Sequence, residues 1–308
     1  MRILIAGAGA TGGSFGARLI EAGREVTFLV RPRRAEQLAR DGLTLDAPDG
    51  RRTLQAKTTT TIAPGDHYDL LIIAVKAPAL ADVLNTAAPA IGPATMILPM
   101  LNGMDHLDAL QAAYPGQVLG GLVKIVATLD EAGTVLQMTP LCTMTVGTLD
   151  GSTLKAEIPQ ALNVPGIELT VDDDVLTRLW EKWAFIASAG VITCLFRGTI
   201  GDILAAGGEA HILRAIAETE EVARSAGHAV SAAGHAQSIG LLTEAGSSFT
   251  SSLYRDLQHG DPVEAEHILG GLAARARKLR VATPLLDATL LQLRTHHRAL
   301  ERSTQTPH

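Results

Sequence analysis

The chain has 308 residues, of which 46% are hydrophobic and 3% aromatic, and its formal net charge at pH 7 is −6. This length suggests two domains, and the scarcity of aromatic residues predicts cores built mainly from Ala, Leu, Ile and Val. The net negative charge argues against nucleic acid as the main partner. No apolar run is long enough for a transmembrane helix, and the first apolar run breaks at Gly7, unlike a signal peptide. We therefore expect no membrane partner.

The cysteine and histidine positions favour neither a disulfide nor a metal site. Cys142 and Cys194 stand far apart, without redox or metal-ligand spacing, which is typical of reduced thiols in a cytoplasmic protein. His296 and His297 have no Cys or carboxylate at ligand spacing, so we expect no bound metal.

Segments prone to form strands alternate with helical segments along residues 1–171. We expect strands at 2–6, 26–30, 43–45, 53–56, 70–75, 96–98 and 167–171, and more strands between 118 and 147. We expect helices at 11–22, 35–40, 77–90, 104–113 and 153–162, and a strand or loop at 58–61. Such alternation is typical of βαβ units, so the predicted fold class of this domain is α/β with a doubly wound parallel sheet.

The strand pattern stops after the acidic run at 172–174. We expect helices at 174–196, 209–226, 231–243, 249–259, 263–280 and 284–301. Thr283 followed by Pro284 is a helix-start signal, with Pro at the first helical position. Residues 172–308 are therefore predicted to form a second, all-helical domain.

A glycine-rich turn follows the first predicted strand. It matches G-x-G-x-x-G between a strand and a helix, which is the context that a dinucleotide-binding turn requires. In such a turn, Gly7 permits the tight bend, Gly9 admits the pyrophosphate, and Gly12 allows close packing of helix and strand. The motif consists of Gly7, Ala8, Gly9, Ala10, Thr11 and Gly12. It favours a Rossmann-type dinucleotide site over a glycine turn without a ligand.

Basic residues follow the second predicted strand, where an NAD-binding chain usually carries an acidic residue for the ribose 2′-hydroxyl. Arg31 stands at this position, with Arg33 and Arg34 behind it. A cation there suits a 2′-phosphate, so the sequence favours NADP(H) over NAD. The alternative is a solvated basic turn.

Two polar residues follow later strands, Lys76 after "DLLIIAV" and Asn102 after "MILPML". Ligands of open α/β sheets bind outside the carboxyl ends of the strands, so both are candidates for that edge. A surface lysine and an ordinary Asn-Gly turn are the alternatives.

Lys182 lies at the start of a long uncharged run, because no charged residue occurs from Trp183 to Phe196. Arg178 stands one turn earlier, and both desolvation and a neighbouring cation lower the pKa of a lysine. Such a lysine can deliver a proton to a developing alkoxide. The alternative is a lysine that reaches solvent or pairs with a carboxylate.

A second cluster of polar residues lies in "SSFTSSLYRDLQHGDPVEAEHILGG". Asp261, Pro262 and Glu264 fit a capping box at a helix start, and Glu264 could also be a site carboxylate. His267 follows one turn later as a possible acid or base. The hydroxyls of Ser251 and Ser252 are either ligand contacts or ordinary helix-start groups.

Taken together, the motifs resemble those of ketopantoate reductases (2-dehydropantoate 2-reductases) over nearly the whole chain. The resemblance is carried by GAGATGG at 7–13, Arg31, VKA at 75–77, NG at 102–103, WEK at 180–182 and SSLYRDLQHGDPVEAE at 251–266. It implies an NADPH-binding Rossmann domain, a helical second domain and an active site in the cleft between them. It also implies a cytoplasmic homodimer that reduces a 2-oxo acid substrate, in pantothenate biosynthesis.

The resemblance also implies roles for particular residues. Lys182 matches the general acid, Asn102 the asparagine beside nicotinamide and substrate, and Glu264 the active-site carboxylate, near the cofactor as well. Ser251 or Ser252 matches the serine that contacts the substrate. Residues 7–12, Arg31 and Lys76 match cofactor contacts, and Ala127 a backbone contact.

The sequence departs from the family pattern at three positions where family members carry asparagines. Ile186, Gly190 and Leu269 stand there. Losing polar ligands weakens the recognition of a hydroxylated substrate. We therefore keep open a more apolar 2-oxo acid, an imine as in opine formation, and an NADP-binding sensor without turnover.

Overall fold

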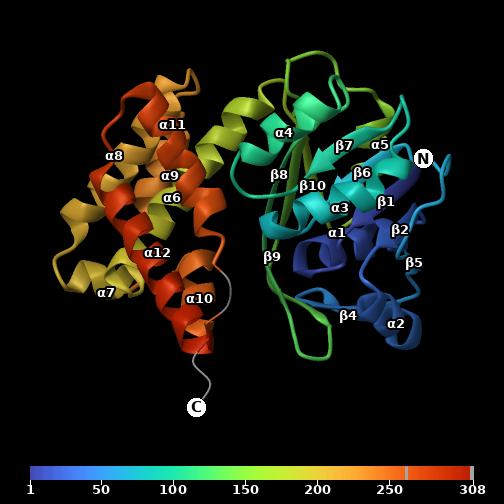
Figure 1. The fold of residues 1–308 in the computed structure, drawn as a ribbon, viewed down its shortest axis with the longest axis horizontal. Helices are drawn as coiled ribbons and strands as arrows, with labels where there is room; N and C mark the ends of the chain where they lie inside the picture. The colour runs from blue at the N-terminus through green and yellow to red at the C-terminus, as the bar shows by residue number, and fades with distance from the viewer. Residues whose placement is uncertain (261–262, 306–308) are drawn as a thin grey trace. The chain divides into compact units, whose positions relative to one another are not determined.

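The computed structural model describes residues 1–260 and 263–305. Its contacts divide the chain into two compact units. The N-terminal unit comprises Met1–Leu101 and His106–Val175, and the helical unit comprises Asn102–Asp105 and the chain from Leu176 onward. In Figure 1 the N-terminal unit carries the blue-to-green elements, and the helical unit the yellow-to-red ones. The turn at Asn102–Asp105 thus belongs with residues far from it in sequence.

The N-terminal unit contains two five-stranded sheets. The first has the order β5-β2-β1-β6-β7, with every neighbouring pair parallel. The second has the order β10-β9-β3-β4, and β8 pairs with β9. The strands are β1 (Arg2–Ala6), β2 (Glu25–Leu29), β3 (Leu43–Ala47), β4 (Gly50–Leu54), β5 (Lys57–Thr59), β6 (Leu70–Ile73), β7 (Met96–Pro99), β8 (Leu119–Leu129), β9 (Val135–Thr148) and β10 (Glu168–Val171).

The first sheet has the order of a doubly wound fold, because β1 neighbours β2 on one side and β6 on the other. The sequence predicted this parallel sheet and the antiparallel hairpin of β3 and β4. It did not predict that the later strands form a separate sheet. The helices of this unit are α1 (Ala10–Glu21), α2 (Pro32–Asp41), η1 (Ala77–Ala79), α3 (Leu80–Ala87), η2 (Ala88–Ala90), α4 (Asp105–Ala113, whose first residue groups with the helical unit) and α5 (Glu157–Leu162).

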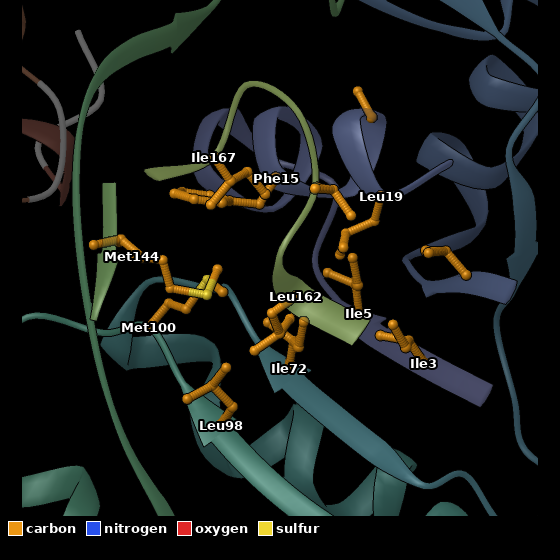
Figure 2. Close-up of a cluster of buried hydrophobic side chains, with 14 of the residues drawn as sticks. Ile3, Ile5, Phe15, Leu19, Ile72, Leu98, Met100, Met144, Leu162 and Ile167 are labelled. Carbon is orange, nitrogen blue, oxygen red and sulfur yellow. The ribbon is translucent and has the colours of Figure 1, made fainter. Parts of the chain in front are cut away.

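Helix α1 is buried along most of its length because it contacts both sheets. Figure 2 shows Phe15 and Leu19 of this helix in one cluster with Ile5 of β1, Ile72 of β6 and Met144 of β9. All five side chains are at most 1% exposed. The glycine turn at the start of α1 is therefore fixed by a helix that is packed on two sides.

The helical unit is built around α6 (Val175–Phe196), whose uncharged run forms hydrogen bonds with residues of three other helices. Contrary to the expectation from the sequence, one window of this helix is long and apolar enough to cross a membrane by length and composition. However, 67% of that window is buried within the protein, as in a core helix. The helices are α6 (Val175–Phe196), α7 (Ile200–Ala205), α8 (Glu209–Ser225), α9 (Ala232–Leu242), α10 (Ser252–His259), η3 (Glu266–Gly270), α11 (Gly271–Leu279) and α12 (Pro284–Gln305).

Two features of this unit differ from the sequence prediction. A short helix, α7, follows α6, and a capping box of Thr199 and Asp202 starts it. The single helix expected at 263–280 is a π-helix, η3, continued by α11. One-turn π-helices often occur at functional sites. The expected caps Asp261 and Pro262 lie outside the described residues.

Candidate active site

The glycine turn joins β1 to α1 at the carboxyl edge of the parallel sheet. Gly7 has φ +102°, and its N–H donates to the Leu29 carbonyl at 3.0 Å. A Cβ added to Gly12 would lie 2.1 Å from the Gly7 carbonyl oxygen. Packing and backbone conformation therefore require glycine at both positions, as the sequence predicted.

Gly9 is different, because the protein itself does not require glycine there. Its φ of −81° suits any residue, and an added Cβ would meet no protein atom within 4 Å. It is the N-cap of α1, with no side-chain cap and no acidic residue in the first turn. The first N–H groups of a helix lack partners within it and suit an anion. This turn, from Gly7 through Ala8, Ala10 and Thr11 to Gly12, therefore fits a pyrophosphate.

Two arginines near this turn have distinct roles. Arg31 is exposed at the N-cap of α2, and its guanidinium makes no hydrogen bond or ion pair within residues 1–260 and 263–305. Arg34, by contrast, donates to the Ala8 and Gly133 carbonyls, both at 3.0 Å. Burial lowers the pKa of Arg34, and the charge of Asp130 only partly opposes this. Arg31 is thus available to a phosphate, whereas Arg34 fixes the glycine turn.

Two more predicted cofactor contacts lie in this unit. Lys76 is exposed and follows β6, whose carboxyl end lies at the same sheet edge as that of β1. Ala127 is half-buried in β8, just after a shift in its register with β9. Register shifts of this kind are common next to active sites. The structure is compatible with both contacts, which remain predictions.

The helical unit holds the predicted proton donor on α6. Lys182 is half-buried, and Phe185 and Ile186, three and four residues later, are half-buried on the same face. Nearly all the residues from Ala187 to Cys194 are buried. Lys182 therefore stands on a partly accessible strip of a helix whose central turns are core. Arg178 contacts the carboxylate of Glu181 at 3.4 Å, so an acid accompanies the expected neighbouring cation.

The polar cluster around α10 separates into structural and accessible groups. The Ser251 hydroxyl is buried, accepts from the Tyr254 N–H at 3.1 Å as the N-cap of α10, and bonds the Thr193 hydroxyl at 2.7 Å. Ser252 is exposed. Glu264 is half-buried just before the helical segment, and its carbonyl accepts from the Ile268 N–H at 3.1 Å. Of the two serines, Ser252 is the better placed to meet a ligand.

Asn102 begins the turn that belongs to the helical unit. It is half-buried, and within residues 1–260 and 263–305 its amide has no hydrogen-bond partner. Gly103 packs against η3, because an added Cβ would lie 2.8 Å from the His267 carbonyl. The structure thus brings Asn102 into the unit that carries Lys182, Ser252 and Glu264.

The three positions without family asparagines are apolar in different ways. Ile186 is half-buried, whereas Leu269 is 0% exposed. A Cβ at Gly190 would lie 2.7 Å from Leu253, so the leucine occupies the space beside this glycine. Phe185 of the same strip contacts Phe249, with ring centroids 6.3 Å apart. The surroundings of this face are therefore mainly hydrocarbon.

The two cysteines and the acidic groups suggest no further chemistry. Both cysteines are free and buried, and burial raises the pKa of Cys194 to about 12. Within the described part of the chain, no group of three His, Cys, Asp or Glu side chains could hold a metal ion.

Comparison with known proteins identifies the family. The model of the family "Ketopantoate reductase PanE/ApbA" matches residues 3–151, and that of its C-terminal domain matches residues 174–297. An uncharacterized oxidoreductase of Bacillus subtilis, YkpB, is 33% identical over 96% of this chain and 99% of its own length. A 2-dehydropantoate 2-reductase of Archaeoglobus fulgidus is 28% identical over 95% of this chain and 96% of its own.

A solved structure shares the fold over both halves. The crystal structure of 2-dehydropantoate 2-reductase from Methylococcus capsulatus superposes with a TM-score of 0.85 at 23% identity, covering 100% of this chain and 99% of its own. Fold, glycine turn and family models together define an NADP-dependent oxidoreductase of the class that acts on CH–OH groups. The chain belongs to the ketopantoate reductase family.

Sequence reasoning missed three contributors to these sites. The sequence placed Arg34 only in a basic group behind Arg31, whereas its guanidinium binds the Ala8 and Gly133 carbonyls. Asp105 and Arg275 were not considered, although they join the Asn102 turn to α11. No local motif marks such a pair, because its members are far apart in sequence.

Proposed function

We propose that this enzyme reduces a 2-oxo acid to a 2-hydroxy acid with NADPH, and that its first candidate substrate is 2-dehydropantoate, in pantothenate biosynthesis. The observation that carries the proposal is Lys182, an ammonium group on the partly accessible strip of a helix whose central turns are buried. Partial desolvation beside an apolar run is unfavourable for a cation, so this placement is typical of a functional lysine. The support for the reaction type is membership of the family over both halves of the chain.

In this proposal an N-terminal domain of residues 1–171, the greater part of the N-terminal unit, holds the cofactor. The first N–H groups of α1 bind the pyrophosphate, while Arg31 and Lys76 pair with the 2′-phosphate and Ala127 contacts the cofactor through its backbone. Arg34 keeps the glycine turn in place. When bound, NADPH supplies the hydride that reaches the keto carbon of the substrate.

The helical domain, assigned to residues 172–308, and the Asn102 turn act on the substrate. Asn102 orients the carbonyl through its amide, and Ser252 contacts the substrate. The Lys182 ammonium donates a proton to the carbonyl oxygen as negative charge develops there. Glu264 orients Lys182 or the hydroxyl of the product. One hydride and one proton convert the ketone to the secondary alcohol, so the reaction balances.

A second candidate is a 2-oxo acid with a more apolar side chain. It is favoured by Ile186, by the fully buried Leu269 and by the leucine that fills the space beside Gly190. A site that lacks polar partners discriminates poorly in favour of a hydroxylated substrate. We further propose a homodimer in the cytoplasm; the support is the family resemblance and, for the compartment, two buried free thiols.

The test is a substrate panel followed by NADPH absorbance. The panel contains ketopantoate, straight and branched aliphatic 2-oxo acids, phenylpyruvate, and a 2-oxo acid mixed with an amino acid. A kcat/KM for ketopantoate below about 10⁴ M⁻¹s⁻¹, with a higher value for an apolar member, favours the second candidate. Turnover only with the amino acid present favours an opine-type imine. Tight NADPH binding without oxidation by any member would make the chain a sensor and refute the proposal.

A further inference from the structure

Arg275 of α11 stands at the meeting point of three segments of the helical unit. Its guanidinium lies over the ring of Trp183, 5.0 Å from the centroid, and 6.0 Å from that of Trp180. It also forms an ion pair with the carboxylate of Asp105. The Arg275 side chain is only 18% exposed. A cation that lies over two indole rings and pairs with a carboxylate is strongly restrained in position.

Asp105 connects this arginine to the turn that begins with Asn102. Gly271, one turn before Arg275 on α11, packs against the same carboxylate, since a Cβ there would lie 2.7 Å from Oδ2. Gly103 lies against the backbone of η3. Asn102 itself has no hydrogen-bond partner within residues 1–260 and 263–305. Its position is therefore set by its neighbours in the turn, and Asp105 is the charged anchor.

The two tryptophans connect the same arginine to the helix of the proton donor. Trp180 and Trp183 stand on either side of Lys182 along α6, and their ring centroids are 5.1 Å apart. The Trp183 indole donates its N–H to the Ile268 carbonyl of η3 at 2.9 Å. Thus α6 is fastened to η3 directly and to the Asn102 turn through Arg275.

We propose that Arg275 is a positioning residue for the reduction. It fixes the position of the turn that carries Asn102 relative to the helix that carries Lys182. This inference rests on the proposed function, because it assumes that Asn102 and Lys182 act on one carbonyl. Reactions between groups held in place lose about 10²-fold for a misplacement on the order of 1 Å. Arg275 acts through both groups and contacts neither substrate nor cofactor in this scheme.

The test compares Arg275→Met and Arg275→Lys with a control on the same helix. The control is Arg277→Met, because Arg277 is 63% exposed and its nearest carboxylate, Asp287, is 3.9 Å away. We expect Arg275→Met to lower kcat by about 10- to 100-fold while the Kd for NADPH stays within about twofold. Arg275→Lys should recover part of the loss, because it keeps the charge near Asp105. Arg277→Met should match the wild type.

A double-mutant cycle with Asp105 shows whether the arginine acts through the turn. Asp105→Asn should lower kcat, and the double variant should be no slower than the slower single variant. Fully additive losses, or an unchanged kcat in Arg275→Met, would overturn the inference. If Arg275→Met does not fold, the half-exposed Asp105→Asn decides alone: unchanged kcat refutes the inference, and lowered kcat with unchanged Kd supports it.

Asn102→Ala, measured in parallel, separates this inference from the proposed function. If it lowers kcat and Arg275→Met does not, only the inference fails. If Asn102→Ala leaves kcat unchanged, the role of Asn102 in the reduction fails first, and the positioning role fails with it.

Discussion

The two units of this enzyme build their candidate sites in opposite ways. In the N-terminal unit the main part of the candidate site is local, because six consecutive residues from Gly7 to Gly12 form the turn and Arg31 follows the next strand. The predicted contacts Lys76 and Ala127 lie later in the chain, after β6 and in β8. In the helical unit the site is assembled from distant segments, with Asn102, Lys182, Ser252 and Glu264 on separate elements. A local site is encoded by spacing and can be recognised from a motif. An assembled site depends on packing, so its supporting residues emerge only from the structure.

The largest expected effect comes from Lys182, in the assembled site. Lys182→Met keeps the length of the side chain but removes the proton donor, so kcat should fall by about 10²–10⁴-fold. The Kd for NADPH, followed by cofactor fluorescence, should stay near the wild-type value, because the cofactor is assigned to the local site. If Lys182→Met lowered kcat and also weakened NADPH binding, the two sites would not be functionally separate.

The next effect distinguishes two arginines within the local site. Arg31→Ala should weaken NADPH binding by roughly 1.5–3 kcal/mol, because a charge-assisted bond to phosphate is lost. The Kd for NADPH should therefore rise by a factor on the order of 10–100. The Kd for NADH should hardly change. Arg34→Met should weaken the binding of NADPH and of NADH equally, because it removes the hydrogen bonds to the Ala8 and Gly133 carbonyls. If Arg31→Ala weakened the binding of NADPH and of NADH equally, the role of Arg31 at the 2′-phosphate would be refuted.

Gly9→Ala tests whether the cofactor, rather than the fold, requires this glycine. The added methyl group meets no protein atom within 4 Å, so the melting temperature should fall only slightly, because alanine is a poorer N-cap than glycine. Crowding against the cofactor should weaken NADPH binding by about 1–3 kcal/mol. Gly240→Ala on α9 is the control, since its Cβ is equally unobstructed. A Gly9→Ala variant that binds NADPH normally would remove the pyrophosphate from this turn.

The smallest effect concerns the packing of the helical unit. Glu218 is 4% exposed, and its carboxylate accepts from the Leu285 and Leu286 N–H groups at 3.0 and 3.2 Å, at the start of α12. Glu218→Ala should lower the free energy of unfolding by about 0.5–2 kcal/mol, as the loss of a helix cap does. Chemical denaturation measures this, with the exposed Glu244→Ala as control. An equal loss in both variants would contradict the capping role.

The sequence predicted the parallel sheet well because buried strands and glycine turns are local signals. It also located α6, since a long uncharged helical run is a signal contained within the segment itself. It could not predict the second sheet, because the pairing of β3 with β9 joins residues far apart in the chain. Nor could it predict the π-helix at Glu266–Gly270 within an apparently continuous helical pattern. Tertiary packing decides both features.

Individual site residues also divide into those that local sequence signals predict and those that only tertiary packing reveals. The motif identified Gly7 and Gly12 correctly as packing requirements, and the structure adds that Gly9 is free of them. For the serine pair the sequence left the register open, whereas the buried cap at Ser251 favours Ser252 as the ligand contact. The residues next to Arg34 and Arg275 in the sequence do not distinguish them from arginines on the surface. Only their contacts reveal that one fixes the glycine turn and the other the Asn102 turn.

In the proposed reaction, hydride from NADPH and a proton from Lys182 reduce a 2-oxo acid. The most direct measurement uses NADPH deuterated at either face of C4, with the best substrate of the panel and mass spectrometry of the product. We expect one of the two labelled cofactors to place one deuterium on C2 of the 2-hydroxy acid, in a one-to-one ratio with NADPH consumed. If neither labelled cofactor transfers deuterium to the product, or if NADPH binds but is not consumed, the result would contradict the account.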